Sequence, residues 1–281
     1  MRDPRYYQIA ALSSLILYGC LSLDMHTSVS IVAVIILTAL LTQFLFTRLL
    51  SLPYFEPRSA LISSLSLSLL LRTNSYTLAC LAAFIAISSK FAIRFRGKHI
   101  FNPTNFAIVV LLLLTDDVWV SPGQWSNATF FCFLAACLGL IVIFRTRRSD
   151  ISIAFLVFYA AILFGRAIWL GDPLAIPLHQ LQSGTLLIFS FFMITDPMTT
   201  PNSRMGRILF AGLVAGTVAA FQFIFYETNG VLYGLVICCM SVSLIDHYLP
   251  DKRYQWHNRN NNSRPVTKNL SNSHDLKGAR I

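Results

Sequence analysis

Charged residues are scarce in this chain. Asp, Glu, Lys and Arg make up 12% of its 281 residues, whereas 55% of the residues are hydrophobic and the mean hydropathy is +0.62. A soluble domain ordinarily carries about 25% charged residues. The composition therefore argues against a water-soluble fold and predicts an integral membrane protein.

Motifs of self-sufficient enzymes are absent as well. The sequence has no nucleotide-binding glycine loop, no HExxH motif, and no Ser, His and Asp set that would meet on one membrane face. Its six cysteines lie in apolar runs without CxxC spacing. This pattern favours small buried residues over a disulfide framework or a zinc site, with iron–sulfur ligation across a subunit interface as the alternative. No apolar run carries Asp, Glu or Lys near its middle, which disfavours a self-sufficient pump or carrier.

Ten apolar runs reach or approach the length of a membrane-spanning helix. They are Tyr7 to Leu23, Ser28 to Phe46, Ser59 to Leu71, Tyr76 to Ser89, Phe101 to Thr115, Thr129 to Phe144, Ile151 to Leu170, Leu181 to Ile194, Ile208 to Tyr226 and Val231 to Ile245. The expected fold class is an all-α polytopic membrane protein with about ten transmembrane helices over residues 1–249. Residues 250–281 are polar and basic, and we expect them to form a disordered cytoplasmic tail.

The basic residues divide unevenly between the two predicted sides. Of the 22 Lys and Arg residues, only Arg72 and Arg166 fall on one side, and the others fall in the alternate loops and the tail. Cytoplasmic loops carry the excess of Lys and Arg, so both termini are predicted to be cytoplasmic. Positive charge in short loops suits an anionic lipid face, and we expect no nucleic-acid partner.

Ten spans divide into five plus five, which would insert the two halves in opposite orientations, as in an inverted repeat. The third run of each half is short, at Ser59 to Leu71 and at Leu181 to Ile194. A helix of 13 residues extends about 20 Å, against a hydrocarbon core of roughly 30 Å. These runs are predicted to be broken or re-entrant, with tilted, kinked helices as the alternative.

Three polar or aromatic stretches interrupt the apolar pattern. In FNPTNF (Phe101 to Phe106), Pro103 suits the first turn of a helix and Asn102 suits its cap. In FFMITDPMTTPNSRMGR (Phe191 to Arg207), Asp196 and Pro197 end an apolar run. Ordinary capping and helix stopping would explain both.

The third stretch, VWVSPGQWSNAT (Val118 to Thr129), is predicted to face outward. Its Trp119 and Trp125 offer flat faces to a ring-shaped ligand, and an aromatic belt without a ligand is the alternative.

These stretches, together with KFAIRFRGKHIFNPTNF and the opening DPRYYQI, resemble the RnfD/NqrB family. Its members are large membrane subunits of ion-translocating, flavin-containing electron-transport complexes. The resemblance extends from residue 1 to about residue 248. It implies a five-plus-five inverted repeat in the bacterial inner (plasma) membrane. It also implies a redox-complex subunit that passes electrons to membrane or periplasmic partner subunits, with ion translocation as a coupled activity, rather than a self-sufficient enzyme.

Members of that family carry FMN joined by a phosphoester to an outward-facing threonine in the sequence Asp-Gly-x-Ser-Gly-Ala-Thr. Thr129 matches this threonine and Ser126 the serine, whereas Gly123, Gln124 and Asn127 depart from the pattern. A modifying transferase must fit its target loop tightly, and side chains where glycine is expected hinder this. Noncovalent FMN or riboflavin is therefore the alternative to a covalent flavin.

The sequence thus predicts a flavin site and no metal site. The residues expected to bind the flavin are Thr129, Ser126, Trp125, Trp119, Asn102, Asn105, Asp196 and Thr199. The rival function is a flavin-free channel or carrier for a small solute, or a scaffold subunit, on the same fold. Flavin absorbance of the purified protein separates the two functions.

Overall fold

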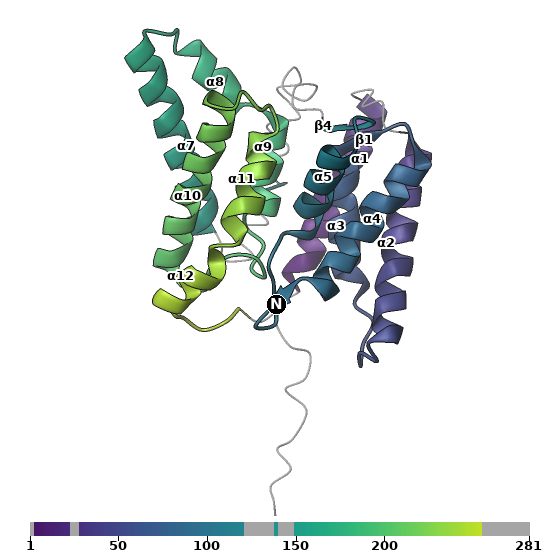
Figure 1. The fold of residues 1–281 in the computed structure, drawn as a ribbon. Coiled ribbons are helices and arrows are strands. Elements are labelled where there is room, and N and C mark those ends of the chain that lie inside the picture. Colours follow the sequence, from purple (N-terminus) through teal and green to yellow (C-terminus); the bar gives the residue numbers. More distant parts are fainter. Residues whose placement is uncertain (1–2, 23–27, 121–137, 140–148, 255–281) are drawn as a thin grey trace, which may run out of the picture.

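The computed structural model describes residues 3–22, 28–120, 138–139 and 149–254, and these residues are mostly helical. Figure 1 shows the helices in two groups that lie side by side. The first group contains α1 (Pro4–Ser22), α2 (Val29–Leu49), α3 (Pro57–Leu70), α4 (Tyr76–Ala92) and α5 (Pro103–Leu114). The second contains α7 (Ser149–Leu170), α8 (Ala175–Leu181), α9 (Gly184–Ile188), the π-helix η1 (Phe189–Met193), α10 (Arg204–Phe223), α11 (Gly230–Cys239) and α12 (Val242–Tyr248).

Two short antiparallel ribbons lie at opposite ends of the first group. At the end away from the N-terminus, β1 (Leu71–Thr73) pairs with β4 (Val118–Val120), and Arg72 lies opposite Trp119. At the other end, β2 (Arg94–Phe95) pairs with β3 (Lys98–His99). The two turn residues between these strands, Arg96 and Gly97, have φ angles of 47° and 78°. Positive φ at both positions is what a tight two-residue hairpin turn requires.

Within the described ranges, three helices, α2, α7 and α10, are long and apolar enough to cross a membrane. The pair α11 and α12, bent by 47°, makes a fourth span if it is counted as one. The all-α membrane class is thus confirmed over the described residues, whereas the ten-span count and the inverted repeat stay predictions. Both third spans are as short as predicted, since α3 has 14 residues and α9 and η1 have five residues each.

Small residues allow the helices to pack closely. On α4, Ala79, Ala82, Ala83 and Ala86 are buried at three- and four-residue spacing, on the side where α4 packs against its neighbours. In the second group, α10 packs against α7 and α11. A Cβ atom added at Gly234 of α11 would lie 2.9 Å from the Val218 side chain. Such close approach is typical of helices that pack within a membrane.

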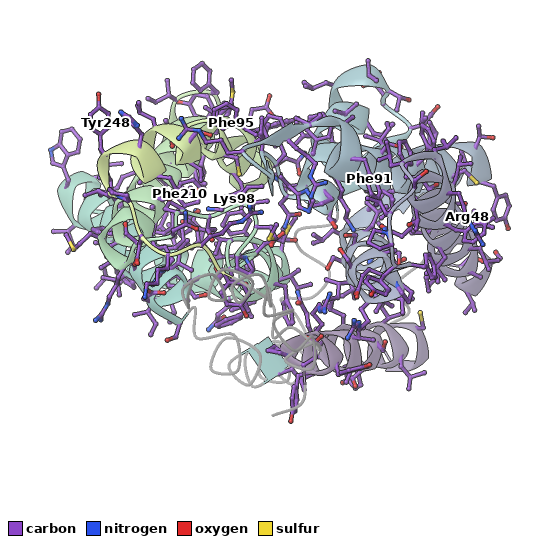
Figure 2. The ribbon with its side chains drawn as sticks, turned by 90° about the horizontal axis from the view of Figure 1, so that it is seen from below. Arg48, Phe91, Phe95, Lys98, Phe210 and Tyr248 are labelled. Carbon is purple, nitrogen blue, oxygen red and sulfur yellow. The ribbon has the colours of Figure 1, made fainter. Side chains whose placement is uncertain are left out.

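The two groups are tied together by the β2–β3 hairpin. Viewed from below, Lys98 lies on the side of the second group, away from Phe91 on α4 (Figure 2). Its Nζ donates to the Thr200 carbonyl (2.8 Å) and to Asp246 Oδ2 (2.9 Å) on α12. Asp246 also accepts from the amide nitrogen (2.8 Å) and the side-chain Nδ2 (3.0 Å) of Asn202. A hairpin of the first group therefore anchors the loop before α10.

Candidate functional site

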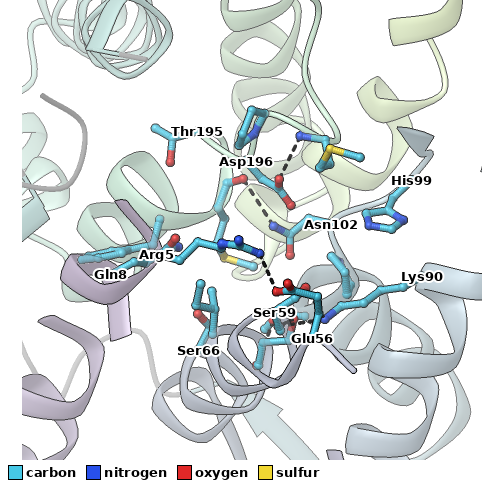
Figure 3. A pocket seen from close by; sticks show the side chains of 18 of the residues that line it. Arg5, Gln8, Glu56, Ser59, Ser66, Lys90, His99, Asn102, Thr195 and Asp196 are labelled. Atoms are coloured by element: carbon cyan, nitrogen blue, oxygen red, sulfur yellow. Dashed lines mark hydrogen bonds and ion pairs between the residues drawn. The ribbon is translucent and has the colours of Figure 1, made fainter. Parts of the chain in front are cut away.

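A pocket of about 320 Å³ opens between the two groups, near the helix ends at which the N-terminus lies. Its polar side chains come from α1, α2, the start and body of α3, α4, the β2–β3 hairpin, the start of α5 and the segment after η1, and Figure 3 shows most of them. This volume is at the lower end of that of small-molecule sites. The polar and charged residues that line it are Arg5, Gln8, Gln43, Glu56, Ser59, Ser63, Ser66, Lys90, Arg94, His99, Asn102, Thr104, Thr195 and Asp196.

Asn102 joins the two groups at this pocket. It is the cap of α5, as its sequence predicts, because its Oδ1 accepts from the Asn105 amide (3.2 Å) and Pro103 occupies the first turn. Its Nδ2 donates to the carbonyl oxygen of Met193 (3.4 Å), at the end of η1. One side chain thus satisfies a free donor at the start of α5 and a carbonyl at the end of η1.

Asp196 lines the pocket and stabilises a turn in the chain after η1. Its Oδ1 accepts from the Met198 amide (2.9 Å), and its carbonyl accepts from the hydroxyls of Thr199 (3.3 Å) and Thr200 (2.9 Å). Asn and Asp side chains stabilise turns in this way. Thr199 is 1% exposed and supports the turn from behind rather than lining the pocket.

Asn105 is also set back from the pocket. Its side chain is buried, its Nδ2 donates to the Leu232 carbonyl on α11 (2.9 Å), and its Oδ1 has no hydrogen-bond partner. Leu232 lines a second pocket of about 370 Å³, between α7, α9, α10 and α11, where Tyr159 Oη donates to Gln222 Oε1 (2.5 Å). Asn105 therefore connects the first motif to the wall of this second pocket.

Lys90, Gln43 and His99 line the first pocket but were not among the predicted site residues. Lys90 is 4% exposed, and its Nζ donates to the carbonyl (2.8 Å) and the Oγ (3.1 Å) of Ser59. Among the described residues, no carboxylate lies within 4.0 Å of this Nζ. The buried Gln43 Oε1 and His99 Nδ1 have no hydrogen-bond partner in the part of the chain that the structure describes.

His99 is neutral in this environment. Burial, together with the nearby positive charges of Lys90 and Arg94, lowers its pKa to about 4. The Lys90 backbone acts in the opposite direction but more weakly. A neutral imidazole has one donor nitrogen and one acceptor nitrogen, so the ring can accept a hydrogen bond from a ligand.

Paired charges close the pocket toward the N-terminus. Arg5 pairs with Asp3 (2.7 Å) and Glu56 (3.0 Å), and Arg58 pairs with the same two carboxylates (both 2.8 Å). Both arginine side chains are at most 15% exposed. The network fixes the start of α1 to the start of α3, so that Arg5 and Glu56 face the pocket as a neutralised pair.

The predicted site residues do not form one cluster in the structure. Asn102 and Asp196 meet in the pocket, with Asn105 and Thr199 behind it. Trp119 lies on β4, at the other end of the first group, and is 45% exposed. Thr129, Ser126 and Trp125 lie outside the described residues. Over the described part of the chain, no group of three or more His, Cys, Asp or Glu residues is placed to hold a metal ion.

Comparison with known proteins shows similarity to subunits named for ion-translocating oxidoreductase complexes. The model of the NQR2, RnfD, RnfE family matches residues 114–255. The RnfD protein of Pectobacterium atrosepticum, named as a subunit of an ion-translocating oxidoreductase complex, is 30% identical over 139 residues, which cover 48% of this chain and 37% of that protein. Proteins with the same name from Salmonella arizonae and Tolumonas auensis are 31% identical over 135 residues (47% and 36%) and 35% identical over 80 residues (28% and 23%). The chain thus matches about a third or less of the length of these relatives.

Proposed function

Because this chain belongs to the NQR2, RnfD, RnfE family, we propose that it is a membrane subunit of an ion-translocating electron-transport complex. In this proposal it holds a flavin, FMN or riboflavin, and passes electrons to partner subunits. The names of its relatives support the complex, since each is an ion-translocating oxidoreductase subunit. In such a subunit the protein binds and tunes the cofactor, which carries out the redox chemistry.

One observation favours the pocket between the two groups as a flavin site. The opening stretch contributes Arg5 and Gln8, and KFAIRFRGKHIFNPTNF contributes residues from Lys90 to Thr104. The third contribution is Thr195 to Met198, from the stretch with Asp196 and Pro197. Three of the four stretches that carry the family resemblance therefore meet at one place, although nearly 200 residues separate the first from the last.

The chemistry of the pocket fits one edge of a flavin ring. The pyrimidine edge of this ring has an N–H between two carbonyl oxygens. In the pocket, Lys90 offers a donor to one of the carbonyl oxygens, and Gln43 Oε1 or His99 Nδ1, which have no hydrogen-bond partner among the described residues, offers an acceptor to the N–H. Buried polar atoms without partners are costly, so a ligand with complementary donors and acceptors would stabilise this arrangement. Phe91 and Phe192 supply apolar walls.

The first experiment measures flavin in the purified full-length protein. We expect a flavin absorbance spectrum, and we expect Gln43→Leu to retain at least tenfold less noncovalent flavin than wild type. Gln222→Leu is the matched control, because it makes the same change in the second pocket.

Other results would contradict the proposal. A protein that contains no flavin but conducts a small solute in vesicles would support the channel or carrier instead. A protein that has neither property would be a scaffold subunit. Equal flavin loss in the two glutamine variants would show that the pocket between the groups is not the site.

Covalent FMN at Thr129 is the second part of the proposal. A phosphoester at the outer face would keep the charged phosphate at the wet interface rather than in lipid. The test is co-expression with a flavin transferase, followed by denaturing electrophoresis and in-gel fluorescence. A brighter band in Asn127→Gly than in wild type would show that this departure from the family pattern limits the modification.

A further inference from the structure

Lys90 is a buried amine at the edge of the pocket. Its contacts are the carbonyl and the hydroxyl of Ser59, which are both uncharged (Figure 3). An ammonium group has three donors, so two bonds leave one N–H for a further partner. A buried charge without a counter-charge is costly, and side chains in this state are normally paired.

Neither of the two carboxylates that line the pocket forms an ion pair with Lys90. Glu56 accepts from Arg5 (3.0 Å) and Arg58 (2.8 and 2.9 Å). Asp196 lies across the pocket, beyond ion-pair distance from Lys90, and its Oδ1 accepts from the Met198 amide. The remaining cation on this side, Arg94, is exposed and adds positive charge. Among the described residues, Lys90 and Arg94 therefore contribute positive charge to this edge of the pocket without a carboxylate in direct contact with either.

The charge of a flavin ring depends on its redox state. The oxidised ring is neutral. Full reduction adds two electrons and one proton and leaves one negative charge, which is spread over a ring nitrogen and the adjacent carbonyl oxygen. Away from bulk water, an ion pair between this charge and a fixed ammonium is poorly screened.

We propose that Lys90 makes this pocket bind the reduced, negatively charged form of the ring more tightly than the oxidised, neutral form. The inference rests on the proposed function, since it concerns the same flavin site. Lys90 acts here as the counter-charge of the ligand. The pocket would thereby raise the two-electron reduction potential of the flavin that it holds.

The test compares binding of the two redox states. The purified full-length protein in lipid nanodiscs is titrated with riboflavin, once in air and once under argon with dithionite, which supplies the electrons while water supplies the proton. In wild type we expect tighter binding of the reduced form. In Lys90→Met the ratio of the two dissociation constants should fall about tenfold, which corresponds to about 30 mV for a two-electron couple.

Three further variants separate the effect of the Lys90 charge from the effects of its other contacts and of other cations. Lys90→Arg keeps the positive charge and should retain the wild-type ratio. Lys90→Gln keeps a donor toward Ser59 but not the charge, and should give the same ratio as Lys90→Met. Arg96→Gln removes a cation from the exposed hairpin turn, which does not line this pocket, and should leave the ratio unchanged.

The outcomes separate this inference from the proposed function. If wild type binds both forms and no Lys90 variant changes the ratio, the inference is wrong and the flavin site stands. If wild type binds neither form, both are wrong. Thermal unfolding of each variant checks the fold, and we expect no large loss in Lys90→Met because it removes an uncompensated buried charge.

Discussion

Removing the carboxylate of Asp246 should test how firmly the two helix groups are joined. Its oxygens accept three hydrogen bonds, from Lys98 Nζ and from the backbone amide and side-chain amide of Asn202. The side chains of Lys98 and Asp246 are only 13% and 17% exposed. Asp246→Ala would remove the carboxylate that pairs with Lys98. It would also remove the acceptor of the Asn202 backbone amide and side-chain amide.

The size of the effect follows from these contacts. Hydrogen bonds to charged groups contribute about 1.5–3 kcal/mol each, and breaking a buried ion pair costs about 3–5 kcal/mol. The bonds share one carboxylate and are not additive, and residual exposure to water reduces the cost. Lys98 also keeps its bond to the Thr200 carbonyl. We therefore expect Asp246→Ala to lower the free energy of unfolding by about 3 kcal/mol.

Unfolding can be followed by circular dichroism during titration with sodium dodecyl sulfate in mixed micelles. The matched control is Asp251→Ala, because Asp251 is exposed and accepts from the neighbouring Lys252 amide. The control should stay within about 0.5 kcal/mol of wild type. A double-mutant cycle with Lys98→Met should give a coupling of about 1 kcal/mol or more. If Asp246→Ala is no less stable than the control, this contact does not join the two groups.

Further predictions concern topology, cofactor attachment and pH. In a background without native cysteines, an impermeant thiol reagent should label a cysteine at Asp116 in intact cells but label one at Arg96 only after the membrane is opened; the reverse pattern would overturn the orientation. Thr129→Val should abolish any covalent flavin fluorescence on a denaturing gel, and fluorescence that persists would move the attachment elsewhere. The pKa of His99 is lowered to about 4 in the folded protein, below about 6.5 in the unfolded chain. The unfolded state therefore binds more protons between these values, and stability should fall as the pH drops from about 6.5 to 4. His99→Gln should reduce this loss in equilibrium unfolding, and an unchanged pH profile would show that His99 is not its source.

Local patterns in the sequence predicted local structure well. Asn102 and Pro103 predicted the start of α5, because capping depends on residues three or four positions apart. The shortness of the third spans also followed from the length of the apolar runs. Such features could be predicted because neighbours along the chain determine them.

Contacts between distant segments could not be predicted in this way. In the sequence, Gln43 is a single amide within an apolar run, and Lys90 is a basic residue at the end of another run. In the structure, both line one pocket together with residues from the other helix group. The sequence predicts Arg72 on the side with few basic residues, but the residue is only 4% exposed, and its Nε and Nη2 have no hydrogen-bond partner among the described residues. Pairing of β1 with β4, more than 40 residues apart, brings about this burial. No periodicity within either segment indicates it.

The π-helix η1 makes the exact length of its segment matter, and not only its composition. Its wide turn is closed by the Ile194 amide, which donates to the Phe189 carbonyl five residues earlier (3.0 Å). An α-helical turn would pass over the same distance with one residue fewer. Converting this turn to α-helix without removing a residue would therefore rotate everything that follows by about 100° and shift it by about 1.5 Å. Thr195 and Asp196 would then turn away from the pocket, even though every side chain that lines it would still be present in the sequence.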